Sequence, residues 1–239
     1  MSGKYYVIGD FHLEDGNKTD PAYNYRDQLL DEVKEYSSLG YTCISIGDFI
    51  DLWAREDTKI WYKNEDFFQE LGKYRFIIVP GNHDRDLKDK NYWFRIRLEQ
   101  LGIIIEHHMI YRDTIVFCHG HYGDPFNHEY WKLGKLFTQY KENLEELGIY
   151  FQIRNILYKG NKINEEAYTV ALVKNPDLNY CVMGHTHNYK VTDKYLDTGF
   201  YALDGYWLIE TTIDKIRIIN KKRNIDRTIT KRYPVEISS

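Results

Sequence analysis

Five short polar motifs, each directly following an apolar run, contain the residues best suited to bind metal ions. In chain order they are Asp10-x-His12, Gly47-Asp48-x-x-Asp51, Gly81-Asn82-His83-Asp84, His119-Gly120-His121 and Gly184-His185-Thr186-His187. Together they offer more carboxylate, imidazole and amide ligands than one ion needs. Mn, Fe, Co, Ni and Zn accept this mixture of nitrogen and oxygen, whereas Mg and Ca rarely bind so many imidazoles. Two divalent ions about 3.5–4 Å apart, bridged by one carboxylate, would use the whole set.

The spacing inside two of the motifs suits a pair of ligands for one ion. Alternate side chains of an extended chain point the same way, so Asp10 should lie beside His12, and His185 beside His187. A competing interpretation is that the motifs are polar turns whose Asp and Asn side chains cap helices. That interpretation could explain one or two motifs, but not five in succession with near-even spacing.

The apolar runs before the motifs predict buried strands. The runs and their motifs together cover residues 4–12, 42–51, 75–84, 114–121 and 179–187. They are rich in Val, Ile and aromatic residues on both faces, as parallel strands are. Helices are expected over 25–38 and, more weakly, over 60–71, so strands and helices alternate as in an α/β fold. Ligands of such folds bind at the carboxyl ends of the strands, where the five motifs should therefore meet.

Distances along the chain support this arrangement. His12, Asp48, Asn82 and His119 are separated in turn by 36, 34 and 37 residues, close to the roughly 30 or more residues of a strand–helix–strand unit. The next step, from His119 to His185, takes 66 residues. The last step is therefore about one unit too long, which indicates an insertion.

The excess falls at about 122–176, where the sequence predicts a helical cap. Apolar and aromatic residues recur there at helical spacing, namely Tyr130, Trp131, Leu133, Leu136, Phe137 and Tyr140. They fit a helix packed onto the body of the protein, and they also fit a groove for an acyl chain or a stacking wall for a base. After 187, short strand-like runs alternate with turns, which suggests a second sheet. We expect one domain, 1–239, that includes the cap.

Composition excludes some classes of protein. The chain has 239 residues, is 43% hydrophobic and 28% charged, and carries a formal net charge of −4, so broad wrapping of nucleic acid is disfavoured. No apolar run is long enough to span a membrane, and the first residues do not read as a secretory leader. Cys43, Cys118 and Cys181 lie in apolar runs without metal-site spacing, which favours buried thiols and a cytoplasmic location.

In order and type, the five motifs resemble those of the calcineurin-like metallophosphoesterase superfamily, over roughly residues 4–220. The resemblance implies two mixed β-sheets sandwiched between helices, here with the helical cap. It implies a first metal ion held by Asp10, His12, Asp48 and His187. It implies a second ion that shares Asp48 and is also held by Asn82, His119 and His185. The implied cofactor is two divalent transition-metal ions, with Mn²⁺ favoured and Fe, Zn, Ni or Co as alternatives.

Departures from two branches of the superfamily bear on the substrate. Protein Ser/Thr phosphatases resemble Gly-Asp-x-x-Asp-Arg-Gly and Gly-Asn-His-Glu, but Leu52 follows the first motif here and Asp84 ends the second. The segment from His119, the helical insertion and the Asp197-Thr198-Gly199 turn are more similar to bacterial UDP-2,3-diacylglucosamine hydrolases. That branch usually has Arg at the position of His83 and Asp at that of His121, which weakens the match to a lipid substrate.

The resemblance implies a metal-dependent hydrolase of phosphoester bonds, and we expect its substrate to be a phosphodiester or pyrophosphate in a nucleotide or nucleotide-linked molecule. His83 would face the leaving group as an acid or charge stabiliser, with Asp84 orienting its ring. Asp51 could join the site or cap the following helix. Arg55, Arg85 and His121 are candidate substrate contacts, each with a plain surface or second-layer role as the alternative.

Other functions stay open at this point. A pyrophosphatase of lipid A synthesis and a metal-dependent nuclease would use the same chemistry. A catalytically silent scaffold would have lost ligands, whereas all seven expected positions are filled here. His107 and His108 follow a strand but belong to none of the five motifs, and they are interpreted as structural. The expected partner is a small phosphoester; the metal, oligomeric state and substrate do not follow from the sequence.

Overall fold

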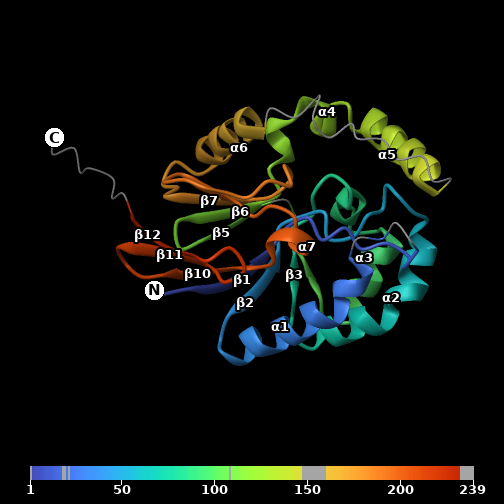
Figure 1. Cartoon of the computed structure of the whole chain (residues 1–239), viewed down its shortest axis with the longest axis horizontal. Coiled ribbons are helices and arrows are strands. Elements are labelled where there is room, and N and C mark those ends of the chain that lie inside the picture. Colours follow the sequence, from blue (N-terminus) through green and yellow to red (C-terminus); the bar gives the residue numbers. More distant parts are fainter. Residues whose placement is uncertain (1, 18–19, 21, 108, 147–159, 232–239) are drawn as a thin grey trace.

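The structure is a computed structural model that describes residues 2–17, 20, 22–107, 109–146 and 160–231. Two β-sheets lie face to face, with helices outside each of them (Figure 1). The helices on one side are α1 (Arg26–Ser38), α2 (Asp57–Gly72) and α3 (Trp93–Gln100), and those on the other are α4 (Pro125–His128), α5 (Trp131–Glu146) and α6 (Gly160–Lys174). This arrangement confirms the predicted α/β fold with two mixed sheets between helices.

The first sheet combines a parallel half and an antiparallel half. Its strand order is β12-β11-β10-β1-β2-β3-β4. The parallel strands are β1 (Lys4–Ile8), β2 (Thr42–Ser45), β3 (Ile77–Ile78) and β4 (Ile104–Ile105). The antiparallel strands are β10 (Trp207–Thr211), β11 (Lys215–Asn220) and β12 (Ile225–Thr230). The C-terminal β-rich part is therefore divided: residues 207–230 extend the first sheet, and only residues 190–197 join the second sheet that the sequence suggested.

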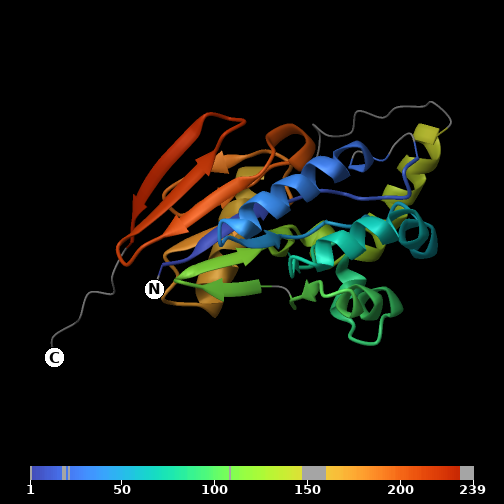
Figure 2. The same ribbon diagram turned by 90° about the horizontal axis from the view of Figure 1, so that it is seen from below.

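The second sheet has strand order β5-β6-β7-β9-β8. Its strands are β5 (Met109–Arg112), β6 (Ile115–Cys118), β7 (Tyr180–Met183), β8 (Lys190–Val191) and β9 (Tyr195–Asp197). The three central strands β6, β7 and β9 are parallel, and β5 and β8 are antiparallel edges. Figure 2 shows the two sheets from a second direction. Motif-bearing strands thus belong to both sheets, and their carboxyl ends point to the same side.

Alternation along β1 explains the layers. Tyr6 and Ile8 pack toward α1 and α2, whereas Tyr5 and Val7 pack between the two sheets, because successive strand residues face opposite sides. A third apolar cluster joins the outer face of the second sheet to α6. Both faces of the central strands are therefore buried, which accounts for their continuous apolar runs.

The two expected helices on the first side are present. The helix predicted over 25–38 is α1, and the one predicted over 60–71 lies inside the longer α2. Leu29 and Val33 of α1 and Ile60 and Phe68 of α2 are fully buried. Their spacing by four residues in α1 and by eight in α2 is that of a helix with one apolar face.

The insertion after β6 divides into two parts with different packing. Helix α6 lies against the second sheet through Ala167 and Ala171, which are buried with Cys181 and Tyr195. Helix α5 is different. The expectation that its apolar face is core is wrong for Tyr130, Leu133, Leu136, Phe137 and Tyr140, whose exposures run from 43% to 64%. Residues 147–159 of the expected cap lie outside the described part of the chain. Within the described residues, no helix is both long and apolar enough to cross a bilayer.

Candidate metal centre

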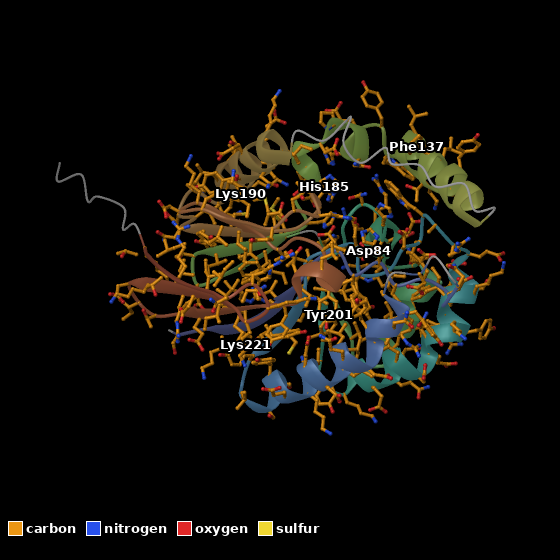
Figure 3. The ribbon with its side chains drawn as sticks, viewed as in Figure 1. Asp84, Phe137, His185, Lys190, Tyr201 and Lys221 are labelled. Carbon is orange, nitrogen blue, oxygen red and sulfur yellow. The ribbon has the colours of Figure 1, made fainter. Side chains whose placement is uncertain are left out.

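The five motifs come together at the carboxyl ends of strands from both sheets. Asp10 and His12 follow β1, Asp48 follows β2, and Asn82 follows β3 in the first sheet. The second sheet contributes three histidines, which follow β6 and β7: His119, His185 and His187. Figure 3 places His185 and Asp84 on facing sides of this region. All seven residues that the sequence suggested as ligands therefore border one site.

The backbone at the motifs is not extended, contrary to the geometry assumed from the Asp-x-His spacing. Asp10, His12, Asp48, His185 and His187 have φ values of 51°, 55°, 48°, 85° and 56°. Residues other than glycine seldom adopt this left-handed backbone conformation, and those that do are often found at functional sites. Each strand thus ends before its ligands begin, and the left-handed turns direct the side chains inward.

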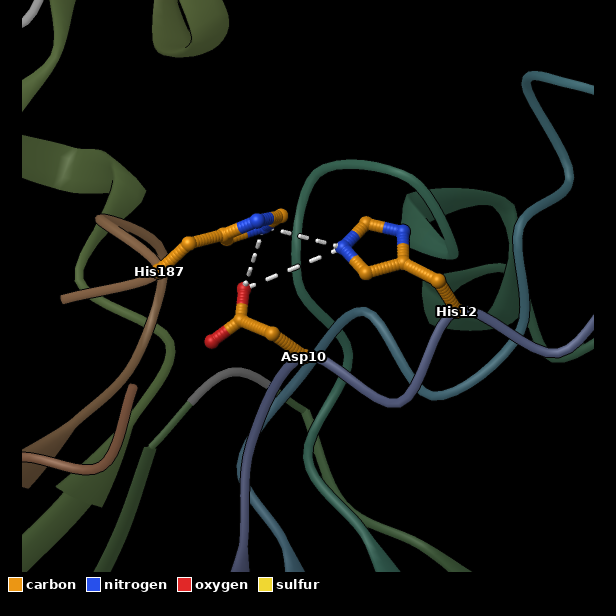
Figure 4. Close-up of side chains that lie close together, drawn as sticks. All are labelled: Asp10, His12 and His187. Atoms are coloured by element: carbon orange, nitrogen blue, oxygen red, sulfur yellow. Dashed lines mark hydrogen bonds and ion pairs between the residues drawn. The ribbon is translucent and has the colours of Figure 1, made fainter. Parts of the chain in front are cut away.

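Three of the side chains form a first group. The Nε2 atoms of His12 and His187 are 3.1 Å apart, and Nε2 of His187 is 3.3 Å from Oδ1 of Asp10 (Figure 4). Nδ1 of His12 lies 3.0 Å from Oδ2 of Asp51, and an ionised carboxylate can only accept a hydrogen bond. In the neutral ring, Nδ1 therefore donates and Nε2 presents a lone pair to the group. A lone pair on Nε2 of His12, with the carboxylate of Asp10 and a second imidazole nitrogen beside it, fits a cation held among the three side chains.

A second group is built in the same way around His119. Its Nδ1 donates to the carbonyl oxygen of Ile46 at 3.1 Å, which leaves the lone pair of Nε2 directed at the site. That nitrogen lies 3.0 Å from Oδ1 of Asn82 and 2.9 Å from Oδ2 of Asp48. Burial lowers the pKa of His119, but the charge of Asp48 outweighs it and raises the pKa to about 9. The carboxylate of Asp48 thus favours a positive charge at Nε2 of His119, which either a proton or a divalent cation can supply.

Asp48 is common to both groups. A carboxylate oxygen of Asp48 lies within 4.8 Å of ring nitrogens of His119 and His185 in one group and of His12 and His83 in another. Although the site is buried, His119 and His83 hold the pKa of Asp48 well below its ordinary value. Asp48 is therefore charged and placed between the two groups, as a bridging carboxylate must be.

The packing around Asp48 leaves no room for larger residues at the motif glycines. A Cβ at Gly81 would overlap Oδ1 of Asp48. A Cβ at Gly47 would come within 2.5 Å of the His119 ring, and Gly47 also has a φ of 102°. These two glycines permit the close approach of three strands that the site requires.

A comparison with protein-family models matches residues 3–189 to the calcineurin-like phosphoesterases. The chain belongs to the calcineurin-like phosphoesterase family. It is therefore a metal-dependent phosphoesterase, and divalent metal ions are its cofactor. The specific resemblance to UDP-2,3-diacylglucosamine hydrolases is not confirmed.

A solved structure shares the fold of this phosphoesterase at low sequence identity. A dimetal phosphatase from Danio rerio is 13% identical, with a TM-score of 0.55, and the alignment covers 96% of this chain and 99% of that one. A protein of unknown function from Aquifex aeolicus is 16% identical, with a TM-score of 0.42 and coverages of 82% and 90%. A search of curated protein sequences finds no match.

His83 of the phosphoesterase is held by Asp51 and not, as expected from the sequence, by Asp84. Its Nδ1 is 2.8 Å from Oδ1 of Asp51, and its ring stacks on Trp53 with the centroids 4.5 Å apart. The carboxylates of Asp51 and Asp48 overcome the effect of burial and raise the pKa of His83 to about 9. His83 is thus fixed on one edge by a carboxylate and on one face by an indole.

Asp84 has a structural role. It accepts backbone N–H groups from Gly81, Phe49 and Ile50 at 2.5, 2.8 and 3.4 Å. Burial and the nearby charge of Asp48 raise the pKa of Asp84 to about 6. It therefore ties two of the motif loops together without contacting the ring that it was expected to orient.

Of the two roles that the sequence left open for Asp51, the structure supports a place in the site. Oδ1 accepts the N–H groups of Trp53 and Ala54 at 3.1 and 3.0 Å, closing a turn, and both oxygens contact site histidines. It does not cap α2, because that helix begins at Asp57 after Glu56. Asp51 is therefore a buried acceptor shared by the two rings that border the centre.

The three candidate substrate contacts differ in their surroundings. Arg55 is engaged with Glu14, Nε to Oε2 at 3.0 Å, which makes it a poor candidate for a phosphate contact. Arg85 lies over the ring of Trp131, 4.1 Å from its centroid. His121 is buried, and burial with the nearby His119 keeps its pKa well below the ordinary value. It lies at the inner edge of the site and is not a surface histidine.

Two further carboxylates border the centre and were missed by sequence reasoning. Oδ2 of Asp124 is 3.1 Å from Nε2 of His185. Asp197 accepts hydrogen bonds from Thr186 and Asn164, and burial raises its pKa to about 7. The turn at Asp197 was noted in the sequence, but nothing in its pattern showed that it contacts the loop between His185 and His187.

Proposed function

We propose that this phosphoesterase holds two divalent transition-metal ions and hydrolyses a phosphodiester or pyrophosphate bond in a nucleotide or nucleotide-linked substrate. The ligands would be Asp10, His12 and His187 for one ion, Asn82, His119 and His185 for the other, and Asp48 for both. The observation that carries the proposal is the convergence of acceptor atoms. Nε2 of His12 and Nε2 of His119 each direct a lone pair at other acceptors, because their Nδ1–H groups donate hydrogen bonds to Asp51 and to the Ile46 carbonyl.

When bound, such a pair of ions supplies Lewis acidity, which lowers the pKa of a water molecule and neutralises charge on the phosphoryl oxygens. The chain's own contribution begins with His83. Asp51 binds its Nδ1 proton, so Nε2 is the atom that can give a proton to the leaving oxygen or stabilise its charge. Trp53 restrains the ring by stacking, which keeps Nε2 in one orientation.

The donor set suits manganese, and Fe, Co, Ni or Zn would also accept it. Three free cysteines, all buried, fit a reducing compartment, and we infer a cytoplasmic location on that ground. The silent-scaffold alternative is disfavoured because every ligand position is filled and His83 is oriented by two neighbours.

The test compares hydrolysis of bis-p-nitrophenyl phosphate and p-nitrophenyl phosphate by protein stripped of metal and reloaded with Mn²⁺. We expect metal-dependent release from the diester and its loss in Asp48→Asn. The matched control is Asp66→Asn, because Asp66 has an 80% exposed side chain. Release from the monoester alone would replace the diesterase proposal with a phosphatase, and failure on both esters with two ions bound would refute the proposal for simple substrates.

A further inference from the structure

Three cationic side chains gather beside the metal centre, on the side toward α4 and α6. They are Arg85, Lys88 and Lys174, which we call the cationic cluster. The Nζ atoms of Lys88 and Lys174 lie 5.7 and 5.5 Å from the ring centroid of Tyr122. Arg85 and Lys88 begin and end the short helix η2 (Arg85–Lys88), and Lys174 is the last residue of α6. Segments far apart in the sequence thus bring three positive charges to one place.

Within the described residues, Asp48, Asp84 and Asp86 act on the cluster electrostatically but form no ion pair with it. Among the described residues, no carboxylate forms an ion pair with Arg85, Lys88 or Lys174, whereas nearby Arg55 and Lys135 pair with Glu14 and Asp86. Burial, with the charges of Arg85 and Lys174, lowers the pKa of Lys88 to about 8 although Asp84 and Asp48 act in the opposite direction. Three like charges held close together, with no carboxylate in direct ion-pair contact, make the place favourable for an anion.

His121 connects the cluster to the metal ligands. Its ring centroid lies 4.2 Å from that of Tyr122 on one side and 5.5 Å from that of His119 on the other. The residue is 3% exposed, and within the described part of the chain its Nδ1 has no hydrogen-bond partner. A buried ring nitrogen without a partner is costly unless a ligand or water satisfies it. The unpartnered nitrogen is an observation separate from the charges, and it also indicates a ligand.

We propose that the cationic cluster binds a second phosphoryl group of the substrate while the first lies at the metal centre. This inference rests on the proposed function and narrows its substrate class to molecules with two linked phosphoryl groups, such as nucleoside diphosphates and their esters. The guanidinium of Arg85 offers two parallel N–H donors to phosphoryl oxygens, and the ammonium of Lys88 adds a partly buried point charge. Stacking on Trp131 restrains Arg85 before the ligand arrives.

The test uses competition against bis-p-nitrophenyl phosphate hydrolysis at fixed free Mn²⁺. The competitors are AMP and ADP, which share the base and sugar and differ by one phosphoryl group. We expect ADP to compete at least roughly tenfold more tightly than AMP, as one additional charge-assisted contact predicts. The preference should decrease as ionic strength rises, because the cluster is partly exposed to solvent.

The variants are Lys88→Met, which keeps the aliphatic bulk, and Lys174→Ala, which changes an exposed side chain. Each should reduce the preference for ADP over AMP about tenfold or more, and Lys88→Arg should restore it. The control is Lys73→Ala, which removes an exposed lysine paired with Glu70. Equal competition by AMP and ADP in the unaltered protein, no competition by either, or an unchanged preference in both variants would overturn the subsite. If the unaltered protein does not hydrolyse bis-p-nitrophenyl phosphate at all, the proposed function is overturned instead.

Discussion

The substitution Asp51→Asn tests how the centre is oriented, because it removes one charge with almost no change of shape. Oδ1 of Asp51 receives the N–H groups of Trp53 and Ala54 and contacts Nδ1 of His83, so the remaining amide oxygen must stay on that side. The new NH₂ group then faces Nδ1 of His12, where Oδ2 now lies at 3.0 Å. His12 can accept that hydrogen bond only with its proton moved to Nε2, the atom that would bind metal.

The expected cost follows from this change of tautomer. Loss of a residue that orients a metal ligand typically reduces metal affinity or activity about 10–100-fold, which corresponds to roughly 1.4–2.7 kcal/mol. The loss should fall at the ion bound by Asp10, His12 and His187, because His119 takes its orientation from a backbone carbonyl that the substitution does not touch.

Calorimetric titration of the metal-free protein with Mn²⁺ measures the two affinities, and kcat for the diester measures the catalytic effect. We expect one weakened site, one site of unaltered affinity, and partial recovery of activity at high Mn²⁺. The control Asp66→Asn should match the unaltered protein. Two sites of unaltered affinity in Asp51→Asn would refute the argument that Asp51 sets the tautomer of His12.

Three further predictions concern other parts of the site. His83→Ala should lower kcat by about 10²–10⁴, most for poor leaving groups, with two ions still bound; an unchanged kcat would show that His83 takes no part in proton transfer. The free energy of unfolding of the unaltered protein should fall as pH rises from about 4 to about 7, because Asp197 loses its proton, and Asp197→Asn should remove this contribution. The pKa of this buried carboxyl is raised to about 7, so the folded state holds its proton longer than the unfolded state, and the effect is at most about 4 kcal/mol. Denaturant unfolding at pH 5 and pH 8 measures it, and an equal pH dependence in both proteins would contradict the assignment. Gly47→Ala should displace the His119 ring and weaken metal binding in a Mn²⁺ titration, because its Cβ would come within 2.5 Å of that ring; full affinity would show that the loop adjusts.

The convergence of the proposed ligands was predictable from the sequence because it depends on topology. Parallel strands must end at the same side of a sheet, so polar residues after successive apolar runs meet whatever the details of the loops. On this principle the first sheet brings together Asp10, Asp48 and Asn82, and the second sheet brings His119 to His185 despite the long insertion between them. The regular spacing of the motifs was informative for the same reason.

Side-chain partners were less predictable, because a motif states residue types and not the direction of a hydrogen bond. Asp84 lies beside His83 in sequence, yet its oxygens bind the backbone of two motif loops, while Asp51 reaches the ring from 32 residues away. Helical periodicity has a similar limit. It groups Leu133 and Leu136 on one face of α5 without stating whether another element covers that face, and both are exposed.

The orientation of the histidines is decided one layer outside the ligands. His12 is fixed by Asp51, His119 by the Ile46 carbonyl, and His185 contacts Asp124. Each acceptor belongs to a different segment from the histidine that it contacts. Only Asp51 is part of a motif, whereas the Ile46 acceptor is a backbone carbonyl and Asp124 lies outside the motifs. A protein could therefore keep every ligand and lose the centre by changing Asp51 or Asp124, since a ring with the wrong tautomer presents a proton where the ion requires a lone pair. The ligand residues alone are thus a weaker indication of an active centre than the ligands together with the acceptors that direct them.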